Sequence, residues 1–210
     1  MKKITRLVIQ KKDKERVNVY LDGEFAFGLA LVEAMHLKVG QVLSEEQIAV
    51  LQDKDAYQKA LGRALDYLTR RPRSYWEIEQ YLQKKEVSAI HLESVLQRLT
   101  ELNLLDDLAF ARYWIENREA FRPRGKYALR YELRQKGVSE TIIEQALSQG
   151  ELDEVESAYR VARKKWRNLR GFENQWQLQQ KLAGYLGQRG FSWDIIREVS
   201  QRLWDTRDDL

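Results

Sequence analysis

Two adjacent carboxylates, Asp106 and Asp107, are the residues in this sequence that first suggest catalytic chemistry. A magnesium-dependent nuclease would need further acids or histidines converging on the same ions. The chain has no cysteine and only two histidines, His36 and His91, and neither keeps a metal-ligand spacing with the aspartates. The pair also stands directly before the apolar run LAFARYW, where a helix favours an N-cap aspartate and an acid in its first turn. We therefore expect Asp106 and Asp107 to start a helix, and the nuclease stays as the weaker alternative.

Other signatures of catalysis are missing from the sequence. No GxxxxGK[ST] phosphate loop, GxGxxG dinucleotide fingerprint or GxSxG nucleophile elbow occurs. We expect His91 to occupy a helix face rather than to bind a metal. The sequence thus predicts a non-enzymatic protein with no catalytic residue, no metal and no cofactor.

Clustered positive charge is the more informative feature. The net charge of +4 is modest, but residues 160–170 carry six basic residues and no acid, and residues 122–136 carry six against Glu132 alone. Such clusters attract nucleic-acid phosphates. The candidate nucleic-acid-binding residues are Arg70, Arg71, Arg73, Arg122, Arg124, Lys126, Arg130, Arg134, Lys136, Arg163, Lys164, Lys165, Arg167 and Arg170.

The spacing of these residues predicts how DNA would be bound. Lys126, Arg130 and Arg134 step by four and form one stripe on a helix. The following segment, SETIIEQAL, is acidic, which argues against a base-reading recognition helix there. We therefore expect contact with the DNA backbone and no sequence readout. Trp76, Tyr127 and Trp166 could stack on bases, although core packing is the more common role of such residues.

Both prolines of the chain lie in an identical tripeptide, Arg-Pro-Arg, at 71–73 and 122–124. Shifting the sequence by these 51 positions superposes the apolar stripes that follow, and a further shift of 53 superposes a third copy. Ser88, Ser139 and Ser192 then coincide as helix N-caps. Gly137 and Gly190 coincide where a helix should end in a left-handed residue, and Glu86 takes that place in the first copy. The chain therefore contains three repeats.

Each repeat reads as three helices. We expect the first helices at 54–69, 107–119 and 154–167, the second at 75–85, 126–136 and 175–189, and the third at 89–101, 140–148 and 193–204. Ser44 and Gln47 form a capping box upstream. Before residue 30 the pattern changes to alternation around Asp22-Gly23, which predicts a hairpin with Val17, Val19 and Leu21 facing Phe25, Phe27 and Leu29. With residues 4–10 it should form a three-stranded sheet.

The predicted fold is mainly α: three tandem three-helix repeats in an elongated, curved array, after a small N-terminal β-hairpin or three-stranded sheet with short helices. We place the N-terminal extension at 1–53 and the repeats at 54–105, 106–149 and 150–210. No run of apolar residues is long enough to span a membrane. The absence of cysteine fits a reducing cytoplasm.

Four separated motifs carry a resemblance to a known family. They are Arg71, Arg73, Ser74 and Glu77 in the pattern R-x-R-S followed by Glu, then LLDDLAFAR at 104–112, ELRQKG at 132–137 and QRGF at 188–191. In this order they resemble the bacterial regulatory protein RecX family, over roughly residues 54–204. Residues 1–53 are similar to the N-terminal extension of longer members.

The resemblance implies a non-enzymatic regulator of the RecA recombinase. It implies binding in the groove of the RecA–DNA filament, which limits filament growth, strand exchange and ATP hydrolysis, and so a place in DNA repair by homologous recombination and in the SOS response. We expect RecA and single- or double-stranded DNA backbone as partners, and a monomer. The alternative is a helical-repeat scaffold that binds DNA or an acidic protein and is unrelated to recombination.

Overall fold

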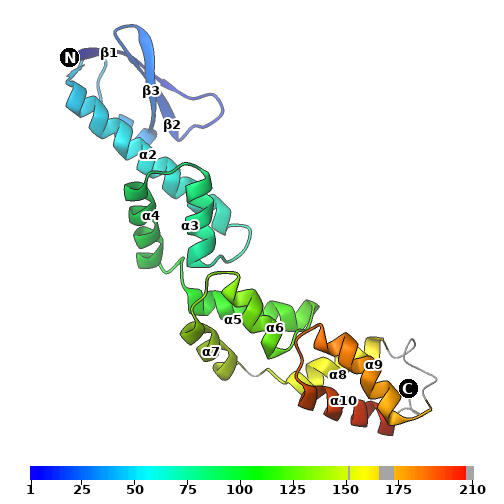
Figure 1. The fold of residues 1–210 in the computed structure, drawn as a ribbon. Helices are drawn as coiled ribbons and strands as arrows, with labels where there is room; N and C mark the ends of the chain where they lie inside the picture. The colour runs from blue at the N-terminus through cyan, green and yellow to red at the C-terminus, as the bar shows by residue number, and fades with distance from the viewer. Residues whose placement is uncertain (151, 166–172, 207–210) are drawn as a thin grey trace. The chain divides into compact units, whose positions relative to one another are not determined.

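The computed structural model describes residues 1–150, 152–165 and 173–206 (Figure 1). It is mainly helical, with a small antiparallel sheet at the N-terminus, as the sequence predicts. The chain divides into two compact units, Met1–Arg71 with Ile78–Leu104, and Pro72–Glu77 with the described part of Leu105–Leu210. The candidate residues Arg167 and Arg170, and also Trp166, lie outside the described residues.

The sheet has four strands rather than three. Strands β1 (Lys2–Ile9), β2 (Arg16–Leu21) and β3 (Glu24–Ala30) form the expected meander, and Asp22 and Gly23 make its left-handed turn with φ of 51° and 95°. A short strand β4 (Val42–Leu43), missed in the sequence because two residues show no periodicity, pairs with β1 to give the order β3-β2-β1-β4. The inner face of the sheet and the short helix α1 (Leu31–Ala34) form one apolar core.

The predicted side-chain alternation fails at Phe25. Val17 and Val19 pair with Leu29 and Phe27 as expected, but a bulge in β3 then sets Phe25 opposite Tyr20 instead of Leu21. One extra residue in a strand turns every following side chain to the other face. Phe25 is consequently 59% exposed, outside the core that Phe27 and Leu29 join.

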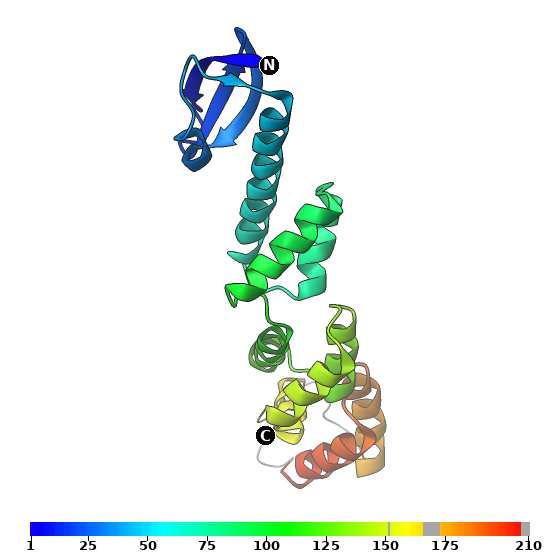
Figure 2. The same ribbon diagram turned by 90° about the vertical axis from the view of Figure 1, so that its left-hand side faces the viewer.

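Helix α2 (Glu45–Leu68) begins at the predicted capping box, where Ser44 and Gln47 exchange both bonds. It is one continuous helix, so the first helix of repeat one starts well before residue 54. Ile48 and Leu51 pack against the core of the sheet, and Nη2 of Arg16 in β2 donates to both carboxylate oxygens of the buried Asp55 at 2.9 and 3.1 Å. The sheet and repeat one thus share a helix within the first unit (Figure 2).

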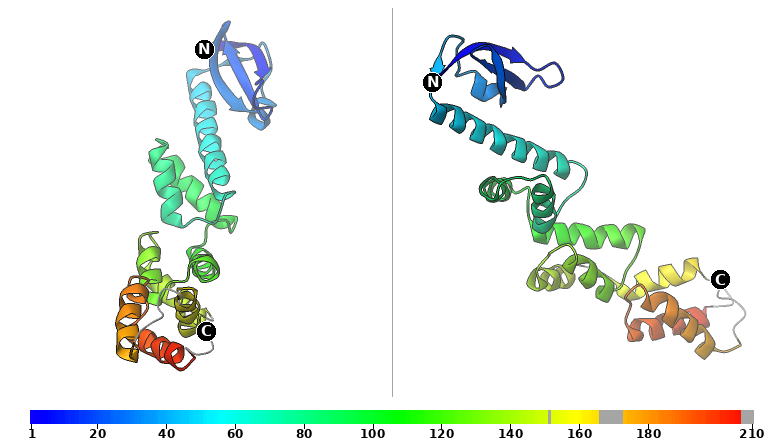
Figure 3. Two further views of the ribbon diagram at one scale, coloured as in Figure 1. Left: turned by 90° about the vertical axis from the view of Figure 1, so that its right-hand side faces the viewer. Right: turned by 45° about the horizontal axis from the view of Figure 1, so that its top comes forward.

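The remaining helices follow the three predicted triplets. They are α3 (Tyr75–Lys84), α4 (Ala89–Glu101), α5 (Asp107–Phe121), α6 (Lys126–Arg134), α7 (Glu140–Gln149), α8 (Glu154–Lys164), α9 (Gln175–Gly187) and α10 (Trp193–Asp205). Repeats two and three each enclose a small apolar core of their own, and α8, α9 and α10 pack as one group (Figure 3). Ser88 and Ser192 cap their helices by side chain as expected, whereas Ser139 stands at the N-cap without a side-chain bond.

The second unit contains the same junction twice. Ser74, before α3, donates from Oγ to the carbonyl of Lys136 at 2.6 Å, and Gly125, before α6, donates its N–H to the carbonyl of Arg189 at 3.0 Å. Both accepting residues precede a left-handed glycine, Gly137 (φ 74°) or Gly190 (φ 79°). The start of the second helix in one repeat therefore docks on the turn that ends the second helix in the next.

A carboxylate completes each junction. The backbone N–H of Tyr75 donates to Asp107 Oδ1 at 2.8 Å, and that of Lys126 donates to Glu154 Oε1 at 2.8 Å. Asp107 and Glu154 are the first residues of α5 and α8. Free N–H groups at a helix start need an acceptor, and here an acid of the following repeat supplies it.

Candidate nucleic-acid interface

The aspartate pair starts a helix, as the sequence predicts. Asp106 Oδ1 accepts from the N–H groups of Leu108 and Ala109 at 2.8 and 3.0 Å, while Asp107 serves the junction with Tyr75. Burial raises the pKa of Asp107, and the hydrogen bond from the Tyr75 N–H opposes that change. No group of three or more potential metal ligands occurs among the residues that the structure describes. Both aspartates therefore have structural partners.

The two arginines of the predicted stripe on α6 are neutralised. Arg130 forms a two-bond pair with Glu144 at 2.5 and 3.0 Å, and Arg134 forms one with Glu140 at 2.6 and 2.7 Å. Hydrogen bonding within these pairs raises the pKa of both arginines and lowers the pKa of both glutamates. The acidic helix α7 thus cancels the charge of the stripe beside it.

Other candidates in this cluster also face carboxylates. Lys126 lies 3.6 Å from Glu154, and Arg124 lies 3.7 Å from Glu132. Lys136 binds Glu77 at 2.7 Å and stands 5.2 Å from the ring centre of Trp114. Glu132 is the only acid within residues 122–136. The partners Glu154 and Glu77 come from distant segments of the chain, so they could not be anticipated from the local sequence.

A cationic pocket lies where the end of α5 meets α8 and α9, all within the second unit. It encloses about 300 Å³ and brings together residues of two predicted clusters. The described residues that line it include four cations and no acid: Phe121, Arg122, Pro123, Arg124, Val161, Lys164, Tyr185 and Arg189. Arg122 and Lys164 are exposed at its rim. A site of one sign with apolar walls concentrates the field on an anion.

Tyr185 lines one wall of this pocket, and two cations lie against its ring. The Arg189 guanidinium lies 3.9 Å and the Lys165 ammonium 4.7 Å from the centre of its ring. Arg189 also donates to the Tyr185 carbonyl at 2.9 Å, which fixes the guanidinium. Arg189 is not among the candidates predicted from the sequence, although the residue lies inside the QRGF motif.

The remaining described candidates do not line this pocket. Arg163 is exposed on the last turn of α8, and Arg70 is exposed after α2. Arg71 and Arg73 are half-buried and take part in contacts with the protein itself. The structure therefore brings together Arg122, Arg124 and Lys164 and gives them a fourth cation, Arg189.

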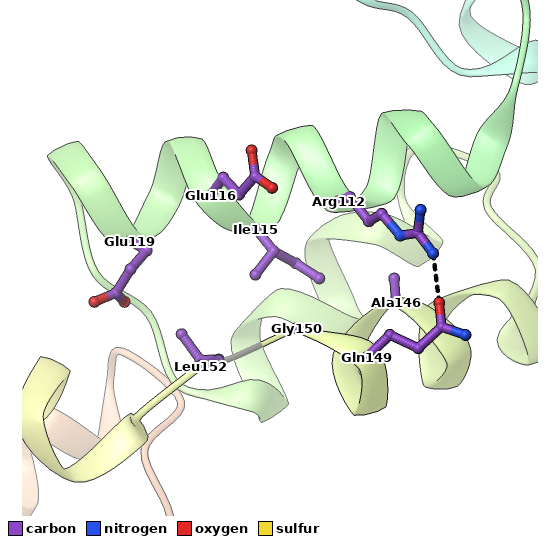
Figure 4. Close-up of a pocket in the computed structure, with 8 residues that line it drawn as sticks. All are labelled: Arg112, Ile115, Glu116, Glu119, Ala146, Gln149, Gly150 and Leu152. Carbon is purple, nitrogen blue, oxygen red and sulfur yellow. Dashed lines mark hydrogen bonds between the residues drawn. The ribbon is translucent and has the colours of Figure 1, made fainter.

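A second cleft, between α5 and α7, has a lining of mixed charge (Figure 4). It encloses about 440 Å³ and is lined by Glu116 and Glu119, while its arginine, Arg112, donates to Gln149 at 2.5 Å. Glu119 accepts from Ser157 at 2.5 Å and pairs with Arg160. The cleft therefore holds both signs of charge, unlike the cationic pocket.

Within the described ranges, no helix is both long enough and apolar enough to cross a membrane. Four segments of the chain match family models. These are described as "Regulatory protein RecX N-terminal domain" (2–44) and as the first, second and third three-helix domains of RecX (56–99, 106–147 and 152–199).

Similar proteins lead to the same family. The regulatory protein RecX of Bacillus pumilus is 34% identical over 209 residues, covering 98% of this chain and 79% of that protein. That of Clostridium tetani is 31% identical, covering 96% and 94%. A crystal structure of regulatory protein RecX aligns with a TM-score of 0.73 at 31% identity, covering 96% of this chain and all of the other. RecX from Lactobacillus salivarius gives 0.63 at 26% identity, covering 71% and 97%. By sequence and by fold, this chain belongs to the RecX family of regulatory proteins.

Proposed function

We propose that this protein regulates the RecA recombinase by binding the RecA–DNA filament and holding the DNA backbone at the cationic pocket. The observation that carries the proposal is the pocket itself, which gathers Arg122, Arg124, Lys164 and Arg189 with no acid among its described lining residues, while Arg124 also faces Glu132 at 3.7 Å. Membership in a family of regulatory proteins supports a role in regulation rather than catalysis.

The pairing pattern favours this pocket over the α6 stripe as the phosphate site. A phosphate at Arg130 or Arg134 would have to displace a bidentate carboxylate, whereas Arg122 and Lys164 stand exposed beside the pocket. Neutralised phosphates release counterions, so each contact should contribute a salt slope of about −0.7 to −0.9. Backbone contacts of this kind carry no sequence preference.

We infer that the effect on RecA is inhibitory. A monomer lying in the filament groove, with its modules at 1–53, 54–105, 106–149 and 150–210, would occupy space that filament growth and strand exchange need, and ATP hydrolysis would fall with them. Single- and double-stranded DNA are both accepted in this proposal, since both present the same backbone charge.

The test compares two double variants that remove equal charge. Arg122→Gln with Lys164→Gln changes the pocket, and Arg130→Gln with Arg134→Gln changes the paired stripe. We expect the first to weaken DNA binding, to reduce the salt slope by about 1.5, and to relieve inhibition of RecA strand exchange and ATP hydrolysis. The second should do much less, although it changes net charge equally. Equal effects of both variants on RecA, or none, would contradict the proposal.

A protein-binding scaffold unrelated to recombination is the second candidate. Tyr127 and Tyr131 stand one turn apart on α6 and are 65% and 63% exposed, which is typical of protein-contact surfaces. Salt-dependent gel shifts with DNA, measured without RecA, separate this candidate from the first.

A further inference from the structure

The outer face of the N-terminal sheet carries a row of three side chains that the repeats do not explain. Arg6 pairs with Tyr20, and Tyr20 pairs with Phe25, so the three residues stand side by side on β1, β2 and β3. The Arg6 guanidinium lies 3.9 Å from the centre of the Tyr20 ring. Phe25 meets Tyr20 edge-on, with ring centres 5.9 Å apart and planes at 77°.

Two irregularities in the sheet create this row. The register shifts between Ile4 and Arg6 in β1, and again between Val19 and Tyr20 where β2 meets β3. Thr5, at the first shift, donates to the Tyr20 carbonyl at 3.2 Å and accepts from the Gly23 N–H at 3.0 Å, which holds the bulge in place. Bulges re-aim side chains and are frequent beside functional sites.

The exposed position of Phe25 lowers the free energy of unfolding relative to a buried one, which suggests that the ring has a role outside the core. Regular alternation would bury its ring beside Phe27 and Leu29, yet the ring is 59% exposed. Burying an aromatic side chain stabilises a protein by roughly 1.5–3 kcal/mol, and the bulge forgoes most of that. An exposed ring next to a fixed guanidinium gives two flat surfaces, and both aromatic rings and arginine planes stack on unpaired bases.

The excess of positive charge around the row favours an anionic partner. Residues 1–30 contain seven basic and four acidic residues. One of the bases, Arg16, is paired with Asp55, which leaves six basic residues against four acids. Two of the acids accept backbone hydrogen bonds, Asp22 from the Lys3 N–H at 2.9 Å and Asp13 from the Glu15 N–H at 3.0 Å. The exposed cations on β1 and on the loop that follows it are Lys2, Lys3, Arg6, Lys11, Lys12 and Lys14. The Arg6 and Phe25 planes can stack on bases, and the neighbouring cations can bind phosphates. This combination favours a nucleic acid with unpaired bases.

We propose that this sheet face is a second nucleic-acid site, which binds single-stranded nucleic acid by stacking bases on Phe25 and on the Arg6 guanidinium. Tyr20 positions the guanidinium, and the lysines of β1 and the β1–β2 loop hold the phosphates. The site differs in kind from the cationic pocket, because it requires bases whereas the pocket requires only phosphates. It does not rest on any role in RecA regulation.

The test uses two ligands with equal backbone charge, a labelled oligothymidylate and an abasic oligonucleotide of the same length. The full chain carries Arg122→Gln and Lys164→Gln, so that the pocket contributes little. Phe25→Ala should weaken oligothymidylate binding roughly 5- to 100-fold, as expected for the loss of one base–aromatic stack. Binding of the abasic oligonucleotide should change less than about twofold, because its phosphates are unchanged.

Three further variants sharpen the result. Phe25→Tyr keeps a ring and should retain binding, and Arg6→Lys keeps the charge but loses the plane, so it should weaken only the base-containing ligand. Val32→Ala removes another exposed apolar side chain of the same module and should have no effect. Equal loss for both ligands with Phe25→Ala, or no loss for either, overturns the proposal. So does a loss confined to RecA-filament binding or to self-association, which would assign the face to a protein.

Discussion

The turns after α3 and after α6 have the same backbone conformation and different residues. Glu86 closes the second helix of repeat one with φ of 58°, and Gly137 closes that of repeat two with φ of 74°. A Cβ added at Gly137 would lie 2.3 Å from the Cβ of Trp76. In repeat one the corresponding carbonyl, that of Lys85, accepts instead from Arg63 of α2 at 3.5 Å. Glycine is therefore required where the repeats pack closely at this turn, whereas the left-handed conformation alone tolerates glutamate.

The largest expected effect is at Gly190, where an added Cβ would lie 2.3 Å from the Ala128 nitrogen, an atom of the backbone that cannot move aside. With the strain of a left-handed residue, Gly190→Ala should lower the free energy of unfolding by about 3 kcal/mol or more. Thermal unfolding measures this. Gly184→Ala, in the same repeat with open space around it, is the matched control and should be neutral or stabilising by about 0.5–1 kcal/mol. Similar losses in both variants would refute the packing explanation.

The next effect concerns Ser74, which is fully buried and bonds both the Lys136 carbonyl and the Glu77 N–H. Ser74→Ala leaves both groups without their partner and should cost about 1–3 kcal/mol in chemical denaturation. Ser139→Ala removes an N-cap hydroxyl that makes no bond and should change stability by less than about 0.5 kcal/mol. If the two variants are equally stable, Ser74 does not join the repeats.

A pH-dependent effect is expected at Asp107. Its folded pKa is raised by burial, so the folded state holds a proton that the unfolded state releases. Protonated Asp107 therefore stabilises the folded state at pH values below the pKa of this group in the unfolded chain. That stabilisation is lost as pH rises through the folded pKa. Asp107→Asn keeps an acceptor for Tyr75 and does not titrate. The stability of the original protein relative to this variant should decrease as pH rises through that range. A constant difference at all pH values would contradict the assignment.

The smallest effect is at Glu86. Glu86→Gly relieves the left-handed strain but adds entropy to the unfolded chain, so we expect stabilisation of no more than about 1 kcal/mol. The melting temperature reports it. A large loss of stability would show that the Glu86 side chain makes an essential contact, and that Glu86 and Gly137 differ in more than their distance from the next repeat.

Local rules predict most of the fold. Helical periodicity, serine N-caps and left-handed helix ends depend on neighbouring residues, and the triplets of helices follow from them. Phe25 and β4 could not be predicted, because a bulge and a two-residue strand leave no period in the sequence. The charge on α6 could not be predicted either, since Glu140 and Glu144 neutralise Arg130 and Arg134 only once α7 folds back. The positions of basic residues can be taken from the sequence. Which of them are free of carboxylate partners, and so able to bind phosphate, depends on the tertiary structure.

The length of α2 has a consequence for insertions and deletions. Its 24 residues extend about 36 Å, with Asp55 bound to the sheet and the buried Ala60 and Ala64 further along, where α2 packs on α4. Each residue advances a helix by about 100°, so one residue inserted between Asp55 and Ala60 would rotate the sheet against repeat one by that angle. Seven inserted residues would nearly restore the phase. The number of residues in this helix, more than their identity, therefore sets the direction in which the N-terminal sheet faces.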